Sequence, residues 1–192
     1  MKIKFFIVFF GIFLSISAYS NEKILIPPEY KSFWAEGERG YKVDREFFNN
    51  TEQVVFMFIP NENILEDAWF TNCFNDKYMG IEVFSCITQN QKFTVLTNDN
   101  GKSIIFNLGK SSEQKQDHKV NYKIDNLPIR TLEHSALLPG VKANFLILDL
   151  KKGKKLIYSW ENSKGYSSEK INLVGFKESM DFAEKMLKLN SH

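Results

Sequence analysis

The chain has 192 residues, of which 43% are hydrophobic and 15% aromatic, with 25 Lys and Arg against 23 Asp and Glu. This length and apolar content suit one folded domain with a real core. The near balance of charge argues against the strongly basic surface through which proteins bind nucleic acid.

Residues 1–20 predict a secretory signal peptide. Lys2 and Lys4 precede a continuous apolar run over residues 5–14, and Ala18 and Ser20 place small residues where signal peptidase requires them. The run is shorter than the roughly 20 residues that span a bilayer. We therefore expect cleavage after Ser20 and a periplasmic or secreted protein without stable membrane insertion, with a retained anchor as the alternative.

Removal of the signal changes the charge balance. Lys2 and Lys4 leave with it, so the basic count falls from 25 to 23 and equals the 23 acidic residues.

Residues 21–50 predict an irregular lead-in with at most one short strand, because Pro27-Pro28 interrupts any regular element. Residues 51–192 predict a single β-rich domain. Three aromatic side chains of the lead-in are candidates for contact with a partner: Trp34, Phe47 and Phe48.

Strand patterns dominate from residue 53 onward. The apolar and β-branched run 53–59 ends at Pro60 and predicts a buried strand. Residues 68–73 and 81–88 predict a hairpin whose tight turn is Met79-Gly80, since Gly80 supplies the positive φ that such turns need.

This hairpin places Cys73 directly opposite Cys86, and these are the only two cysteines of the chain. An oxidising compartment favours their pairing. A disulfide closing so short a loop contributes about 3 kcal/mol. A metal pair or a redox centre is the alternative, but the sequence has no Cys-x-x-Cys spacing and no histidine near either cysteine.

Residues 92–97 and 102–108 predict a second hairpin around Asn100-Gly101, a dipeptide typical of hairpin turns. Residues 118–125 alternate strictly between apolar and polar side chains, which predicts a strand with one buried face. The segment 109–118 is polar throughout and predicts an exposed loop.

The hydrophobic period then changes to that of a helix. Residues 139–155 place Val141, Phe145 and Leu148 on one stripe, which we expect to face the core, with Leu146 and Leu150 widening it. Residues 144–150 also fit a strand, and this alternative stays open.

The end of the chain predicts a strand pair, 155–161 and 167–173, followed by a helix. The helix places four apolar residues on one face: Phe176, Met180, Ala183 and Leu187. Together these elements predict an α+β fold, mainly an antiparallel sheet or sandwich with a short helix and a C-terminal helix packed on it.

Residues suited to catalysis are few, and no pattern combines them. The histidines are isolated in sequence: His118, His134 and His192. No zinc-protease, nucleophile-elbow, phosphate-loop or dinucleotide motif is present. Carboxylates near two aromatics allow a glycan hydrolase as a less favoured alternative: Glu62, Glu66 and Asp67. We expect no catalytic residue, no metal site and no cofactor.

The chain resembles the invasion-associated locus B family of bacterial periplasmic or secreted proteins in three features. These are Trp69 four residues before Cys73, the second cysteine after a short hairpin, and the closing segment 150–186. Three motif residues carry the resemblance together with the cysteines: Trp69, Gly175 and Phe176. The resemblance covers about residues 66–187. It departs from the family at residues 128–140, where a second cysteine pair is usual. Residues 120–125 and the closing strands also resemble a periplasmic type VI secretion accessory protein.

The resemblance implies a non-enzymatic exported protein of the bacterial envelope that acts on a protein partner in the envelope or the host, in host invasion or virulence. It brings no catalytic residues with it. A periplasmic inhibitor, an immunity protein or a secretion-system accessory protein is the alternative, with the loop 109–118 as a candidate for insertion into an enzyme cleft.

Overall fold

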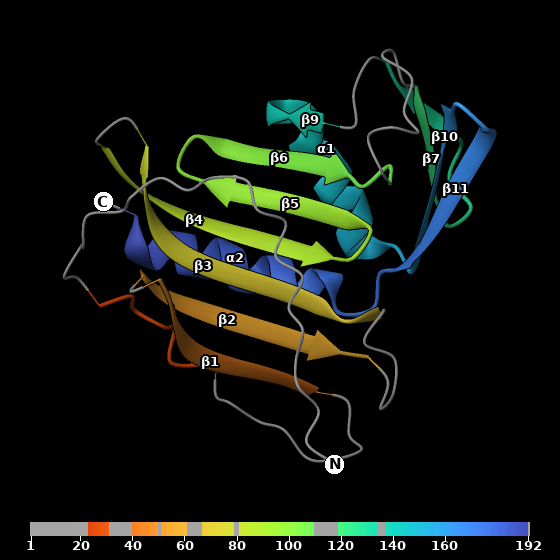
Figure 1. Ribbon diagram of the computed structural model, residues 1–192. Helices are drawn as coiled ribbons and strands as arrows, with labels where there is room; N and C mark the ends of the chain where they lie inside the picture. The colour runs from red at the N-terminus through yellow and green to blue at the C-terminus, as the bar shows by residue number, and fades with distance from the viewer. Residues whose placement is uncertain are drawn as a thin grey trace.

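The computed structural model describes residues 23–30, 40–49, 51–60, 67–78, 81–109, 119–133 and 137–191. It has two antiparallel sheets and two helices, which confirms the predicted α+β class (Figure 1). The expected signal peptide and its cleavage site, Trp34, the Met79-Gly80 turn and nearly all of the polar loop 109–118 lie outside the described residues.

The larger sheet has the strand order β1-β2-β3-β4-β5-β6-β9. Its strands are β1 (Gly40–Phe48), β2 (Thr51–Ile59), β3 (Trp69–Tyr78), β4 (Ile81–Asn90), β5 (Phe93–Asn98), β6 (Gly101–Phe106) and β9 (Leu137–Pro139). The smaller sheet has the order β11-β10-β7-β8. Its strands are β7 (Val120–Ile124), β8 (Arg130–Leu132), β10 (Lys155–Asn162) and β11 (Gly165–Asn172).

Both helices cover the same face of the larger sheet (Figure 1). Helix α1 (Gly140–Lys152) lies against β6 and β9, and helix α2 (Phe176–Asn190) crosses β2 to β5 and touches α1. No helix in the described ranges is long and apolar enough to cross a membrane.

The hairpin registers follow the sequence pattern closely. Cys73 pairs with Cys86 across β3 and β4, as the turn arithmetic predicts. In the next hairpin Asn98 pairs with Gly101, so the turn residues are Asp99 and Asn100, one position earlier than predicted. Strand β7 buries its apolar positions and leaves the polar ones half-exposed, as the alternation predicts.

Strand β1 is longer than the short strand that the sequence allows in the lead-in. It runs over nine residues and pairs with β2 along its whole length, from Gly40 opposite Ile59 to Phe48 opposite Thr51. Residues 23–30 have no regular structure, yet Ile24 is buried, and its carbonyl accepts a 2.6 Å hydrogen bond from Arg45.

The core consists of two hydrophobic clusters on the helix side of the larger sheet. One surrounds Trp69 and reaches the smaller sheet, and the other surrounds Phe56 and includes both cysteines. Phe58 packs against both clusters. Trp69 and Phe176 stand with ring centroids 4.8 Å apart, and the Trp69 indole donates to the Asn172 carbonyl at 3.1 Å.

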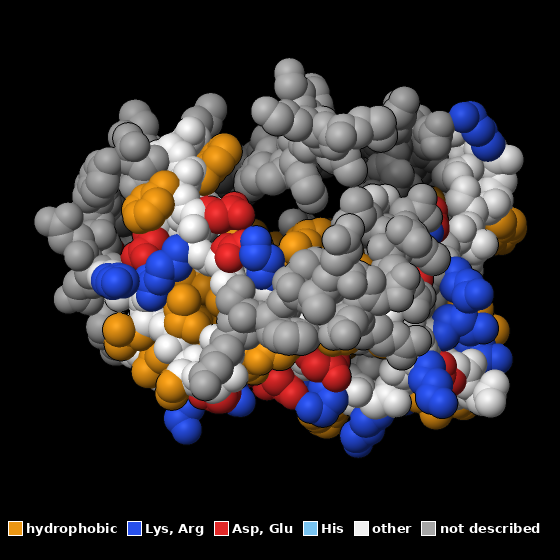
Figure 2. Space-filling view, turned by 90° about the horizontal axis from the view of Figure 1, so that it is seen from below, with side chains coloured by type: hydrophobic (Ala, Val, Ile, Leu, Met, Phe, Trp, Pro, Cys, Tyr) orange, Lys and Arg blue, Asp and Glu red, His pale blue; other side chains and the backbone are white. Residues whose placement is uncertain are grey.

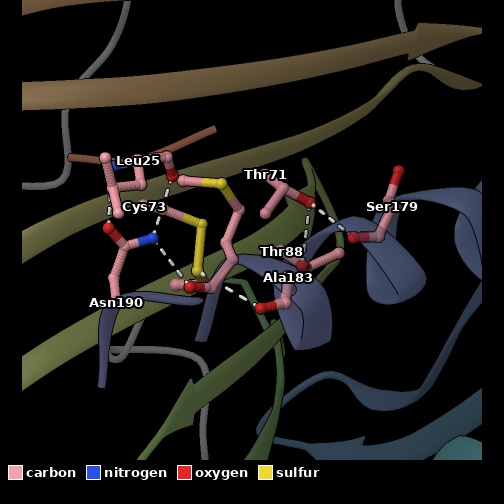
Figure 3. Close-up of a disulfide and its surroundings, with 9 residues drawn as sticks. Leu25, Thr71, Cys73, Thr88, Ser179, Ala183 and Asn190 are labelled. Carbon is pink, nitrogen blue, oxygen red and sulfur yellow. Dashed lines mark hydrogen bonds between the residues drawn. A yellow bond between two sulfur atoms is a disulfide. The ribbon is translucent and has the colours of Figure 1, made fainter. Parts of the chain in front are cut away.

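The disulfide lies under α2. Cys73 and Cys86 are bonded and fully buried, and Cys86 Sγ lies 3.7 Å from the Ala183 carbonyl oxygen. Figure 3 shows the bond enclosed between β3, β4 and the helix. The disulfide therefore joins the two central strands at the point where α2 packs on them.

Polar contacts at both ends of α2 hold it in place (Figure 3). The Thr71 and Thr88 hydroxyls are 2.9 Å apart, and Thr71 also donates to the Ser179 carbonyl at 3.2 Å. At the other end of the helix, the Asn190 amide accepts from Leu25 N at 2.7 Å and donates to Leu25 O at 2.9 Å. The C-terminal helix is thereby bonded to the sheet and to the N-terminal segment.

Helix α1 is present, which excludes the strand alternative. Of its predicted core stripe, Leu146 and Leu150 are buried as expected, whereas the other three residues are not. Val141, Phe145 and Leu148 are 68%, 64% and 53% exposed. The residues that face the sheet lie on the opposite side of the helix: Ala143, Leu146, Ile147 and Leu150. Strand β9 determines this rotation, because it pairs with β6 immediately before the helix and buries Leu138.

Candidate interaction site

The acids and histidines considered for catalysis fall mostly outside the described residues. These are His118, His134, His192, Glu62 and Glu66. Asp67 is described, and its carboxylate accepts a 3.1 Å hydrogen bond from the Asn172 amide, which ties the start of β3 to the end of β11. Among the described side chains, no group of three His, Cys, Asp or Glu is placed to hold a metal ion.

The described surface carries both signs of charge. Figure 2 shows acidic and basic side chains side by side along the lower rim of one face, with hydrophobic side chains between them. On β1, Phe47 is 74% exposed and Phe48 is 45% exposed, so the two candidate contact aromatics that the structure describes reach solvent. They lie at the end of an edge strand and line no described cavity.

The outward stripe, defined as Val141, Phe145 and Leu148, is the most exposed apolar feature of a helix in the described chain. Its spacing of four and three residues places the side chains on one face of α1, opposite the buried face. Helices with apolar residues on two opposite faces are usually buried on both of them. In this chain the sheet covers only one of them.

A groove of about 430 Å³ runs beside the outward stripe, between α1, α2 and the β5–β6 hairpin. Leu148 belongs to both features, because it lies on the rim of the groove and in the stripe. The groove combines an apolar wall with a few polar groups, which is typical of binding sites. Its principal lining residues are Thr97, Lys102, Ile147, Leu148, Glu184 and Leu187.

Thr97 contributes an unusual polar group to this groove. Its side chain follows Phe93 and Val95 on the helix-facing side of β5 and is only 1% exposed. The hydroxyl has no hydrogen-bond partner within the described structure. A buried hydroxyl without a partner costs about 1–3 kcal/mol, so its presence requires a reason.

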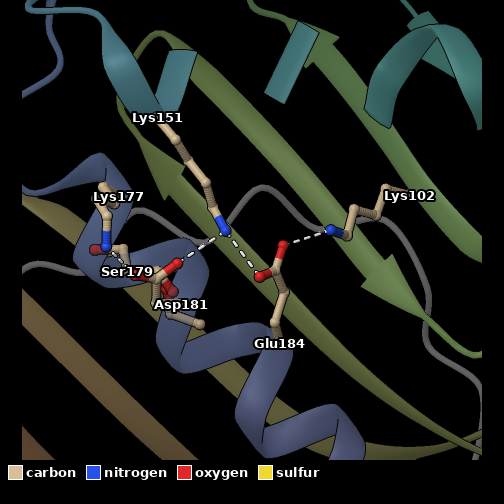
Figure 4. A network of polar contacts seen from close by, with 7 residues as sticks. Lys102, Lys151, Lys177, Ser179, Asp181 and Glu184 are labelled. Carbon is tan, nitrogen blue, oxygen red and sulfur yellow. Dashed lines mark hydrogen bonds and ion pairs between the residues drawn. The ribbon is translucent and has the colours of Figure 1, made fainter. Parts of the chain in front are cut away.

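Glu184 of α2 is held between Lys102, which also lines the groove, and Lys151 of α1 (Figure 4). Lys151 of α1 contacts Glu184 at 2.7 Å and Asp181 at 2.8 Å, and Lys102 of β6 reaches the other oxygen of Glu184. Lys177 pairs with Asp181 at the outer side of this network. These pairs connect α1, α2 and β6, and they position the three walls of the groove.

The network keeps its members charged. Burial raises the pKa of Glu184, but hydrogen bonds from Lys102 and Lys151 outweigh it and hold that pKa below its ordinary value. Burial likewise lowers the pKa of Lys151, and its bonds to Asp181 and Glu184 raise it above the usual range. Glu184 is therefore an ionised partner of two lysines at neutral pH, which suits a structural role better than proton transfer.

Three further lysines lie on the helices that carry the outward stripe and one wall of the groove. Lys142 and Lys152 lie near the two ends of α1, and Lys188 lies near the end of α2, all three exposed. No ion pair in the described structure involves any of them. The apolar stripe thus has a basic rim that no described acidic side chain neutralises.

The groove and its polar groups escape prediction because they depend on tertiary contacts. Lys102, Lys151 and Glu184 are far apart in sequence, and nothing local distinguishes them from other surface charges. The outward stripe had a sequence signal, since 139–155 carries apolar residues on more than one face. The pattern alone does not tell which face meets the sheet.

Comparison of the chain with protein-family models, with curated proteins and with solved structures finds no significant match.

Proposed function

We propose that this chain is an exported bacterial protein that acts by binding another protein in the envelope or the host, without catalysis. The outward stripe on α1 is the observation that carries the proposal. Three large apolar side chains more than half exposed on one helix face are the mark of a contact surface. They lie beside a groove whose walls are held by ion pairs.

Export is supported by two features. The first 20 residues have the composition of a signal peptide. The structure contains a buried disulfide, and such bonds persist mainly in oxidising compartments. The resemblance to the invasion-associated locus B family agrees with this proposal and extends it to host invasion or virulence.

Site-specific photo-crosslinking in the producing cells tests the proposal. A photoreactive phenylalanine analogue replaces Phe145 in one strain and Tyr166 in another. Tyr166 lies on β11 and is 81% exposed, so it is a matched aromatic away from the stripe. We expect a discrete protein adduct from position 145 and none from position 166.

Two results would contradict the proposal. One is the absence of any adduct at position 145 under conditions where the protein is exported and folded. The other is turnover of peptidoglycan by the purified protein, which would favour the hydrolase alternative.

A further inference from the structure

The size of the groove limits what it can hold. At about 430 Å³ it lies near the lower end of ligand-sized sites, which begin at about 300 Å³. This space accepts a few inserted side chains and not the surface of a globular domain. The outward stripe continues the apolar surface from Leu148 on the rim to Phe145 and Val141.

The spacing of the stripe suits a helical partner. A helix that lies along α1 presents side chains at intervals of three and four residues, the same intervals as those of Val141, Phe145 and Leu148. Amphipathic helices bind other proteins in this way, with their apolar side chains inserted into a groove between helices. One such side chain fits over Ile147 and Leu187 inside the groove.

The basic rim selects the charge of the partner. Lys142, Lys152 and Lys188 are exposed and lack ion pairs in the described structure. Complementary charge at the rim of an interface accelerates association and rejects partners of the same sign. An acidic helix therefore matches this surface, whereas a basic one is repelled.

A second copy of the chain fits less well. The stripe exposes about 370 Å², taking about 200 Å² for a whole large side chain. Each partner of a standard interface buries about 800 Å². Two stripes packed face to face also bring Lys142 and Lys152 of both copies together, which like-charge repulsion opposes.

Thr97 forms part of the base of the groove. Its hydroxyl is buried and lacks a partner in the described chain, so it lies beneath the surface on which an inserted side chain would rest.

We propose that the groove between α1 and α2, together with the outward stripe, binds an acidic amphipathic helix of the partner protein. This inference rests on the proposed function and adds the chemistry of the partner to it. The helix packs its apolar face along Val141, Phe145 and Leu148 and inserts one side chain into the groove over Ile147 and Leu187. Its acidic residues meet Lys142, Lys152 and Lys188.

Selection from a displayed library of helical peptides tests this inference. The mature, oxidised protein is the target, and the peptides have about 20 residues so that helices form. We expect the enriched peptides to carry a net negative charge and apolar residues at helical spacing. Their affinity falls about tenfold or more for Phe145→Ser and for the double variant Lys142→Glu, Lys152→Glu, and is unchanged for Tyr166→Ser.

Neutral or basic enriched peptides, or binding that is insensitive to Phe145→Ser, would overturn the inference. Two further assays identify other occupants. Phe145-dependent binding to phosphatidylglycerol vesicles would assign the stripe to a lipid surface, and Phe145-dependent dimerisation in analytical ultracentrifugation would assign it to a second copy.

The two proposals fail separately. A protein adduct at position 145 combined with neutral or basic peptides leaves the interaction function standing and removes the acidic helix. Acidic peptides that bind the purified protein, without any adduct in the producing cells, retain the chemistry of the groove and contradict the proposed function.

Discussion

Gly175 offers the sharpest test of how the C-terminal helix is joined to the sheet. It precedes the first residue of α2 with a φ of 92°, a conformation that side chains other than glycine rarely adopt. A Cβ added there would stand 2.1 Å from Cδ1 of Phe58, well inside van der Waals contact. We predict that Gly175→Ala lowers the free energy of unfolding by about 3 kcal/mol.

Two effects make up this magnitude. The left-handed backbone costs an alanine roughly 1–2 kcal/mol. The overlap with the Phe58 ring adds the cost of overpacking, about 1–3 kcal/mol, because Phe58 packs against both hydrophobic clusters and has little room to move.

Urea unfolding of the oxidised protein measures both effects. Gly109→Ala is the matched control, since Gly109 has a φ of 82° and nothing stands within 4 Å of an added Cβ. We expect the control to cost about 1 kcal/mol, the backbone part alone. In a double-mutant cycle, Phe58→Ala should recover at least about 1 kcal/mol of the loss in the Gly175→Ala background. Equal losses in Gly109→Ala and Gly175→Ala, with no coupling to Phe58, would refute the steric argument.

Further predictions concern the disulfide and the groove. Reduction of the Cys73–Cys86 bond, with a sequence separation of 13, should lower the free energy of unfolding by about 3 kcal/mol; a difference below about 1 kcal/mol between urea titrations with and without reductant would contradict this. Thr97→Val should raise the melting temperature of the free protein, because it removes a buried hydroxyl without a partner, and a lower melting temperature would show that the hydroxyl is satisfied. The pKa of Glu184 is below its ordinary value of 4.5, because two lysine hydrogen bonds outweigh the burial that raises it. Its contribution to stability is therefore present above pH 4.5 and is lost as the pH falls through the lowered pKa. Glu184→Gln should flatten the loss of stability on acidification in that range, whereas Glu178→Gln, exposed on the same helix, should not; equal slopes would contradict the pairing.

Local patterns predicted the strands whose faces differ most in environment. Strand β7 alternates apolar and polar residues because one face meets the core and the other meets solvent. The register of β3 and β4 followed from one glycine and two cysteines, since a two-residue turn leaves a single way to pair the strands.

Strand β1 was harder to predict because its stability comes from its neighbour. In the part of β1 whose burial is described, only Val43 is buried, so its pattern does not separate it from a charged loop. Its hydrogen bonds to β2 form only after the sheet has assembled. The ion pairs around Glu184 depend in the same way on three distant elements that meet.

In helix α1, the residues that the fold needs lie on one face, and the residues that we propose for binding lie on the other. The helical periodicity of residues 139–155 showed that this segment has apolar residues suited to burial. The pairing of β9 with β6 decides which of these residues become buried. Stability requires the inward face, and it gives no reason for Phe145, which is 64% exposed. Phe145→Ser should therefore change the free energy of unfolding by no more than about 0.5 kcal/mol, as surface substitutions do. A loss above about 1 kcal/mol in urea unfolding would show that the outward stripe serves the fold, and the interaction surface would lose its main support.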